Sequence, residues 1–192
     1  MPADADDRVI LVVGDSLSAE YGLPRDSGWV HRLSERLRSD RREYSVVNAS
    51  ISGDTSQGGL ARLPRLLAQL RPRIVLIELG ANDGLRGLDI EQMRANLQAM
   101  IDRCRAAHAR MVLIGMRIPP NYGRAYTGQF ADSFTILARR NRVGLVPFLL
   151  DGFADELDQF QPDHIHPTEQ AQARMLDNVW PVLEPLLDAA GH

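Results

Sequence analysis

Short apolar runs alternate with amphipathic segments along most of the 192-residue chain. Five of the runs are short and contain many β-branched residues, which is typical of buried parallel strands. These runs cover residues 9–13, 44–47, 74–79, 111–114 and 145–148. Between them, apolar residues recur at helical spacing. The alternation predicts a three-layer α/β/α sandwich around a parallel sheet, with residues 1–192 forming a single domain.

Two of the predicted helices carry boundary signals. Asp89 and Gln92 stand at the start of an apolar helical face, where they predict a capping pair. The last amphipathic segment, residues 168–187, contains Pro181 and Pro185. Because proline lacks an N–H group, we expect Pro181 to kink this helix and Pro185 to help end it.

Polar, glycine-bearing segments follow the first three predicted strands directly. They cover residues 14–16, 48–55 and 80–84. The carboxyl ends of parallel strands meet at one edge of a sheet, so these three segments should converge in space. That edge is where open α/β sheets bind their ligands.

Composition excludes several classes of function. The formal net charge is −3 and there is no basic stripe, so a nucleic-acid partner is not expected. The chain contains no lysine. This excludes a Schiff-base lysine, a pyridoxal-phosphate lysine and a Walker-type phosphate-binding lysine. The single cysteine, Cys104, falls on an apolar helical face and is interpreted as a buried structural thiol.

No apolar stretch is long enough to span a membrane, so stable membrane insertion is not expected. The segment Met1–Asp7 is polar and acidic, unlike a signal peptide. The protein would therefore be cytoplasmic, or periplasmic if an export signal has been removed. No oligomeric state can be read from the sequence, and a monomer is compatible with it.

Ser16 and a histidine near the other end of the chain are candidates for nucleophilic catalysis. A serine hydroxyl needs a base within hydrogen-bond reach. His31 and His108 fall in predicted helices and His192 is terminal, which leaves His164 and His166. His166 is preferred because the next residue is a proline, which fixes the backbone that leads into the last helix. Asp163, three residues before His166, could hold the tautomer of its imidazole.

Acyl transfer also requires hydrogen-bond donors for the oxyanion. The candidates are the backbone N–H groups of Ser16 and Gly53 and the side-chain amide of Asn82. Glycine at position 53 permits close approach of the backbone to a ligand. Taken alone, Gly53 and Asn82 are more typical of ordinary turns, and Ser16 of a helix N-cap.

Four blocks together resemble the signature motifs of the SGNH hydrolases, also called GDSL hydrolases, in order and in spacing. The blocks are Gly14-Asp15-Ser16-Leu17-Ser18, Gly53-Asp54-Thr55, Gly80-Ala81-Asn82-Asp83 and Asp163-x-x-His166. Further stretches are similar to the bacterial thioesterase I/arylesterase group within that family. These stretches are residues 47–55, 84–87 and 119–123.

The resemblance implies a flavodoxin-like sandwich with a five-stranded parallel sheet. It also implies a triad of Ser16, Asp163 and His166, with Ser16, Gly53 and Asn82 forming the oxyanion hole. Members of this group hydrolyse acyl thioesters, aryl esters and lysophospholipids, and many are exported to the periplasm.

The acyl chain is expected against the loops after the third and fourth predicted strands, with Leu85, Arg86, Pro120 and Tyr122 as candidate substrate contacts. Two residues depart from the family pattern. His164 stands where relatives often have glycine, and a bulky residue cannot freely adopt a positive φ, so the loop is expected to differ there. Glu20 would add a negative charge near the mouth of the site.

Two other functions are compatible with parts of the sequence. Asp163, His164 and His166 have side chains that can bind metals, and with nearby aspartates such as Asp54 they would suit a metal-dependent phosphoesterase. The same fold could also serve as a ligand-binding domain without catalytic activity. Our preferred prediction is a serine acyl hydrolase that acts through an acyl-enzyme intermediate and needs neither a metal nor another cofactor.

Overall fold

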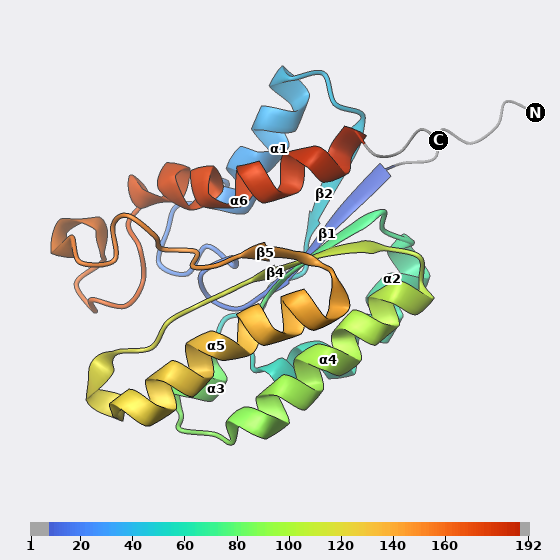
Figure 1. Ribbon diagram of the computed structural model, residues 1–192. Helices are drawn as coiled ribbons and strands as arrows, with labels where there is room; N and C mark the ends of the chain where they lie inside the picture. Colours follow the sequence, from blue (N-terminus) through green and yellow to red (C-terminus); the bar gives the residue numbers. More distant parts are fainter. Residues whose placement is uncertain (1–7, 189–192) are drawn as a thin grey trace, which may run out of the picture.

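The computed structural model describes residues 8–188, which form a five-stranded parallel sheet covered by helices on both faces (Figure 1). The strand order is β2-β1-β3-β4-β5. The strands are β1 (Arg8–Gly14), β2 (Tyr44–Asn48), β3 (Ile74–Glu78), β4 (Arg110–Ile114) and β5 (Gly144–Val146). The predicted α/β sandwich with a five-stranded parallel sheet is confirmed.

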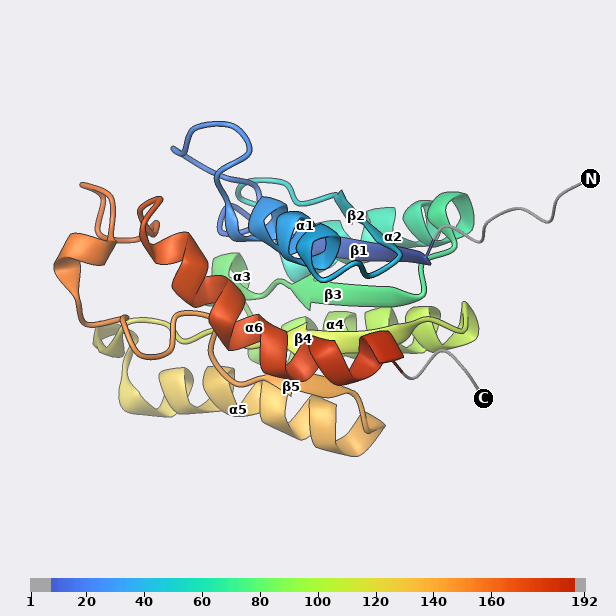
Figure 2. The same ribbon diagram turned by 90° about the horizontal axis from the view of Figure 1, so that it is seen from above.

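Two layers of helices enclose the sheet, as the two views in Figures 1 and 2 show. Helices α1 (Trp29–Ser39) and α6 (Ala171–Asp188) pack together on one face. The other face carries α2 (Ser56–Leu70), α4 (Ile90–Ala106) and α5 (Arg124–Asn141). The short helix α3 (Ala81–Leu85) and the 3₁₀ turns η1 (Pro120–Tyr122) and η2 (Leu157–Gln159) belong to the connections after the strands.

The central strands are buried on both faces. Every residue of β3 is buried, and Ile10, Leu11, Val12 and Val13 of β1 are completely inaccessible to solvent. Burial on both sides explains why these strands appear in the sequence as continuous apolar runs rather than as alternating patterns.

The last strand is shorter than predicted. β5 ends at Val146, although the apolar run continues to Phe148. Pro147 has no N–H group to donate to a neighbouring strand, so the ladder stops before it. Phe148 is still buried, and it contributes to the cavity described below instead of to the sheet.

The predicted helix signals are correct only in part. The Asp89 side chain accepts a hydrogen bond from the N–H of Glu91 (2.9 Å) and caps α4, but Gln92 donates to Asn96 instead of completing a capping pair. Pro185 does not end α6, which continues to Asp188. The buried side chain of Leu187 keeps this last turn packed against the core.

The strand order places a topological switch point beside β1. β1 lies between β2 and β3, and the connections through α1 and α2 leave on opposite faces of the sheet. The segments after β1 and β3 therefore flank a crevice at the carboxyl edge of the sheet, where such folds bind ligands.

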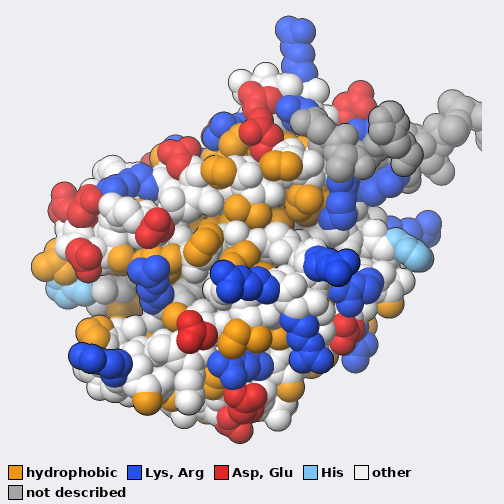
Figure 3. Space-filling model, viewed as in Figure 1, with side chains coloured by type: hydrophobic (Ala, Val, Ile, Leu, Met, Phe, Trp, Pro, Cys, Tyr) orange, Lys and Arg blue, Asp and Glu red, His pale blue; other side chains and the backbone are white. Residues whose placement is uncertain are grey.

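The surface carries mixed charges over the face seen in Figure 3, where arginines lie among acidic and apolar side chains. None of the helices within residues 8–188 is long and apolar enough to cross a bilayer. The polar segment Met1–Asp7 and the terminal His192 lie outside the described residues.

Candidate active site

Ser16 lies in the tight turn that follows β1. The N–H of Asp15 donates to Glu78 Oε2 (3.2 Å), and the Ser18 hydroxyl donates to the same oxygen (2.8 Å). The N–H of Leu17 donates to Asp15 Oδ1 (3.0 Å). These bonds tie the residues on both sides of Ser16 to Glu78 of β3, so that a buried network holds the turn that carries its hydroxyl.

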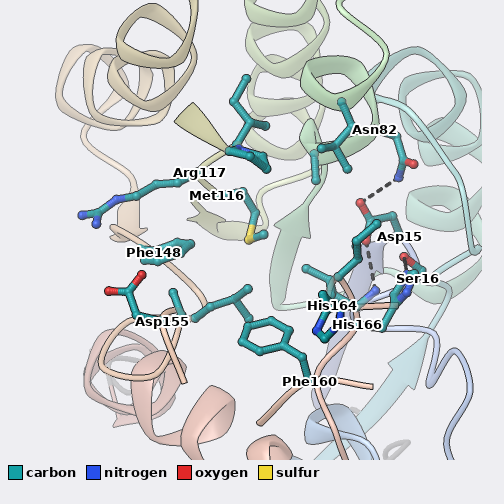
Figure 4. Close-up of a pocket in the computed structure, with 18 of the residues that line it drawn as sticks. Asp15, Ser16, Asn82, Met116, Arg117, Phe148, Asp155, Phe160, His164 and His166 are labelled. Atoms are coloured by element: carbon teal, nitrogen blue, oxygen red, sulfur yellow. Dashed lines mark hydrogen bonds between the residues drawn. The ribbon is translucent and has the colours of Figure 1, made fainter. Parts of the chain in front are cut away.

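His166 comes from the segment between η2 and α6, and its Nε2 lies 2.9 Å from Ser16 Oγ (Figure 4). Its Nδ1 lies 2.6 Å from Asp163 Oδ2. The other oxygen of Asp163 accepts the N–H groups of Ile165 (2.9 Å) and His166 (3.0 Å). The structure thus brings Ser16, His166 and Asp163 together in a line, although 150 residues separate the serine from the histidine.

The Asp163 carboxylate is held in its ionised form. Burial alone would raise its pKa, but the hydrogen bonds from the His166 backbone, the His166 ring and the Ile165 backbone outweigh burial and lower the pKa to about 2. An ionised carboxylate accepts a proton-bearing Nδ1 and leaves the unprotonated Nε2 facing Ser16. This tautomer is the one in which His166 can act as a base toward Ser16.

The three oxyanion candidates come from three separate segments, with Ser16 after β1, Gly53 after β2 and Asn82 in α3. Gly53, after β2, has a φ of +79°, which a residue with a side chain rarely adopts. Asn82, in α3, donates its side-chain amide to Asp15 Oδ2 (3.0 Å). Within residues 8–188, the N–H groups of Ser16 and Gly53 have no hydrogen-bond acceptor.

A buried pair of carboxyl groups supports this site and was not anticipated from the sequence. Glu78 is fully buried, and its burial beside Asp15 raises its pKa well above the usual value. Burial likewise raises the pKa of Asp15 to about 6, against the lowering effect of hydrogen bonds from Leu17, Glu78 and Asn82. The only signal in the sequence is an acidic residue at the end of an otherwise apolar strand.

A cavity of about 610 Å³ opens beside Ser16. In Figure 4, Ser16, Asn82 and His166 lie at one end and Arg117 and Asp155 at the other. Most of the lining is apolar and comes from the segments after β4 and β5 and from the segment that carries His166. The apolar lining consists of Leu17, Ala81, Leu85, Met116, Ile118, Pro119, Pro120, Phe148, Leu150, Ala154, Phe160 and Ile165.

The four candidate substrate contacts do not all reach this cavity. Leu85 and Pro120 line it. Arg86 instead donates to the carbonyl of Gly53 (2.8 Å), and the Tyr122 hydroxyl donates to the carbonyl of Leu85 (2.7 Å). Arg86 and Tyr122 therefore contact the loops around the cavity and not its interior.

The two departures from the family pattern have different outcomes. His164 does adopt the left-handed conformation (φ 56°), although a bulky residue was not expected to take a positive φ there. The Glu20 carboxylate binds the N–H groups of Asp26 (3.0 Å) and Gly28 (2.7 Å) and does not line the cavity. The Glu20 carboxylate therefore stabilises the loop that precedes α1 instead of placing a charge at the mouth of the cavity.

The histidines and acidic residues do not assemble a metal site in the part of the chain that is described. Across residues 8–188, no three or more His, Cys, Asp or Glu side chains are grouped so that they could hold a metal ion. Both ring nitrogens of His166 already have partners, Asp163 and Ser16. His31 lies in α1 as predicted, whereas His108 lies two residues beyond α4 and not inside a helix.

Comparisons with known proteins agree with this geometry. The model of the GDSL-like lipase/acylhydrolase family matches residues 12–174. Esterase TesA of Pseudomonas aeruginosa is 50% identical over 180 residues, which cover 94% of this chain and 90% of TesA. Thioesterase 1/protease 1/lysophospholipase L1 of Escherichia coli is 43% identical over 179 residues, covering 93% of this chain and 85% of that protein.

A solved structure also matches along nearly the whole fold. The structure of the psychrotrophic esterase EstA from Pseudoalteromonas, inhibited by monoethylphosphonate, superposes with a TM-score of 0.89 at 41% identity. The match covers 95% of this chain and all of EstA (100%). The chain therefore belongs to the GDSL-like lipase/acylhydrolase family and is an esterase of the serine hydrolase class.

Proposed function

We propose that Ser16 is the nucleophile of this esterase and that His166 and Asp163 activate it. The observation that carries the proposal is the 2.9 Å distance between His166 Nε2 and Ser16 Oγ. As Ser16 Oγ attacks the acyl carbonyl carbon, Nε2 takes the hydroxyl proton, and the Asp163 carboxylate stabilises the imidazolium that forms.

The oxyanion that develops on the carbonyl oxygen is stabilised by three donors: the N–H groups of Ser16 and Gly53 and the amide of Asn82. Collapse of the tetrahedral intermediate transfers the proton from His166 to the departing alcohol or thiol and leaves an acyl group on Ser16. Water, deprotonated by His166, then attacks the acyl-enzyme and releases the carboxylic acid, which restores the serine. This sequence needs no cofactor.

The substrates are acyl esters and thioesters with an apolar acyl chain. The chain would lie in the cavity beside Ser16, whose volume of about 610 Å³ and largely apolar lining suit a small lipid-like group. Relatives described as an esterase and as a thioesterase and lysophospholipase support this substrate class. By the same family resemblance we propose a periplasmic site of action, which fractionation of the source cells would check.

Replacement of Ser16 tests the mechanism directly. Ser16→Ala should lower kcat for a water-soluble aryl ester by about 10⁴-fold or more, because the nucleophile is lost while binding and the oxyanion donors remain. Circular dichroism and thermal unfolding should show an unchanged fold. A folded Ser16→Ala protein with near-normal turnover would contradict the proposal.

Covalent labelling separates an enzyme from a ligand-binding domain of the same fold. An organophosphonate should add one phosphonyl group per chain at Ser16, and Ser16→Ala should remain unlabelled when examined by mass spectrometry. Exhaustive chelation before the assay addresses the metal-dependent alternative. A wild-type protein that is not labelled, or one that loses ester hydrolysis on chelation, would refute the serine mechanism.

A further inference from the structure

The ring of Tyr21 packs against the ring of His166 in a tilted arrangement. The ring centroids lie 4.4 Å apart and the planes are inclined by 38°. Tyr21 belongs to the loop after Ser16, so a residue from the serine segment contacts the imidazole from the opposite end of the chain. Tyr21 is 50% exposed, which indicates that its ring is not placed there mainly to fill the core.

The two hydrogen bonds of His166 restrain one motion of its ring only weakly. Nδ1 is bonded to Asp163 and Nε2 to Ser16, and a hydrogen bond at an imidazole nitrogen is directed along the ring plane. Such bonds hold the two nitrogens within that plane but oppose rocking of the ring out of the plane much less. An aromatic ring against one face blocks this rocking, and its negative π-face favours the imidazolium that forms during attack.

Gln161 connects the two segments that carry these rings. Its side-chain amide donates to the carbonyls of Tyr21 (2.9 Å) and Pro167 (3.1 Å), and its backbone N–H donates to the carbonyl of His166 (2.7 Å). Gly22, with a φ of +70°, leaves room for this side chain, because a Cβ at that position would lie 2.1 Å from Gln161 Oε1. The backbones that bear the two rings are thus held in register by one residue.

We propose that Tyr21 is a positioning residue for His166 and that Gln161 acts through Tyr21 by holding the two loops together. The proposal rests on the proposed role of His166 as the base. Neither Tyr21 nor Gln161 lines the cavity, so neither is expected to bind the acyl chain.

The matched pair Tyr21→Ala and Tyr21→Phe tests the stacking. For a short, water-soluble aryl ester, Tyr21→Ala should lower kcat by about 10- to 100-fold with little change in KM, because a misplaced base slows chemistry rather than binding. Tyr21→Phe keeps the ring and should stay within about twofold of wild type. An Ala variant with wild-type kcat, or one whose loss lies in KM and grows with acyl-chain length, would overturn the proposal.

Two readouts distinguish positioning from a general structural effect. The rate of Ser16 phosphonylation by an organophosphonate should fall in parallel with kcat in Tyr21→Ala. In ¹⁵N-histidine-labelled protein, the low-field proton signal of His166 Nδ1–H should broaden in the Ala variant and stay sharp in the Phe variant. Unchanged phosphonylation and an unchanged signal in Tyr21→Ala would refute positioning. Absence of labelling in the wild type would instead refute the serine mechanism itself.

A double-mutant cycle tests the role of Gln161. Gln161→Met removes both side-chain hydrogen bonds at similar size and should lower kcat less than Tyr21→Ala does. Because Gln161 acts through Tyr21, the double variant should be no slower than Tyr21→Ala alone. Fully additive losses would show that Gln161 acts independently of Tyr21 and would overturn that part of the proposal.

Discussion

A single left-handed residue shapes the turn that leads into His166. His164 has a φ of 56°, and its N–H donates to the carbonyl of Gln161 (2.8 Å), which closes a turn over residues 161–164. A residue with a Cβ is strained there, and glycine is not. The sequence identified the position as unusual, but it could not show that the hydrogen-bonded turn would outweigh the strain.

His164→Gly should therefore stabilise the protein. We expect the free energy of unfolding to rise by about 0.5 to 1 kcal/mol, because relief of the left-handed strain exceeds the added entropy of glycine in the unfolded chain. Urea unfolding measures the change. His164→Ala is the control and should show no gain, since alanine keeps the strain; an equal gain in both variants would refute this explanation.

Asn82 carries the second prediction at the scale of single residues. Its amide lies beside Asp15 and Ser16 as a proposed oxyanion donor. Asn82→Ala should lower kcat by about 10²- to 10³-fold and change KM much less, because the lost bond strengthens only in the transition state. Steady-state kinetics on an aryl ester check the result, and an unchanged kcat would remove Asn82 from the oxyanion hole.

The strands of this fold were largely predictable because strands that are buried on both faces of a sheet consist of continuous apolar runs. The convergence of the three polar segments followed from parallel topology alone. The cavity wall was less accessible to prediction. Phe148 and Phe160 line the cavity from irregular segments after β5 and η2. Such segments have no regular spacing of apolar residues from which their packing could be predicted.

The contact between α3 and α5 provides a test at the scale of elements. A Cβ on Gly84 in α3 would lie 2.7 Å from the ring of Phe130 in α5 and 2.8 Å from Ile118 Cγ2. Gly84→Ala should lower the free energy of unfolding by about 1 to 3 kcal/mol, because the buried ring cannot move without disturbing the core. Urea denaturation of the purified variant measures this loss.

Gly128 in α5 is the matched control for that substitution. It is exposed, and a Cβ there would meet nothing within 4 Å. Gly128→Ala should instead raise the free energy of unfolding by about 0.5 to 1 kcal/mol through helix propensity. If both substitutions changed the free energy of unfolding in the same direction, close packing between α3 and α5 would not determine the outcome at Gly84.

At the scale of the whole molecule, the buried carboxyl groups of Glu78 and Asp15 should link stability to pH. Burial raises both pKa values in the folded protein, Asp15 from 3.8 to about 6 and Glu78 well above 4.5. The folded state therefore holds more protons than the unfolded chain above about pH 4, so stability falls as the pH rises through this range. Asp163 acts in the opposite direction. Its pKa is lowered in the folded protein, so the stability that its ionised form contributes is lost only as the pH falls below about 4.

Glu78→Gln isolates the larger of these effects. Glutamine is neutral at every pH and retains an oxygen that can accept from Asp15 N and Ser18 Oγ, as Glu78 does now. Near pH 4.5 the variant and the wild type should have similar free energies of unfolding, because Glu78 is largely protonated in the folded protein and costs little there. Toward pH 8 the variant should become progressively more stable than the wild type, since it no longer has to keep a buried carboxyl group protonated or bury its charge. Denaturant unfolding at pH 4.5, 6 and 8 measures the difference, and a difference that does not change with pH would show that Glu78 is not the group that titrates.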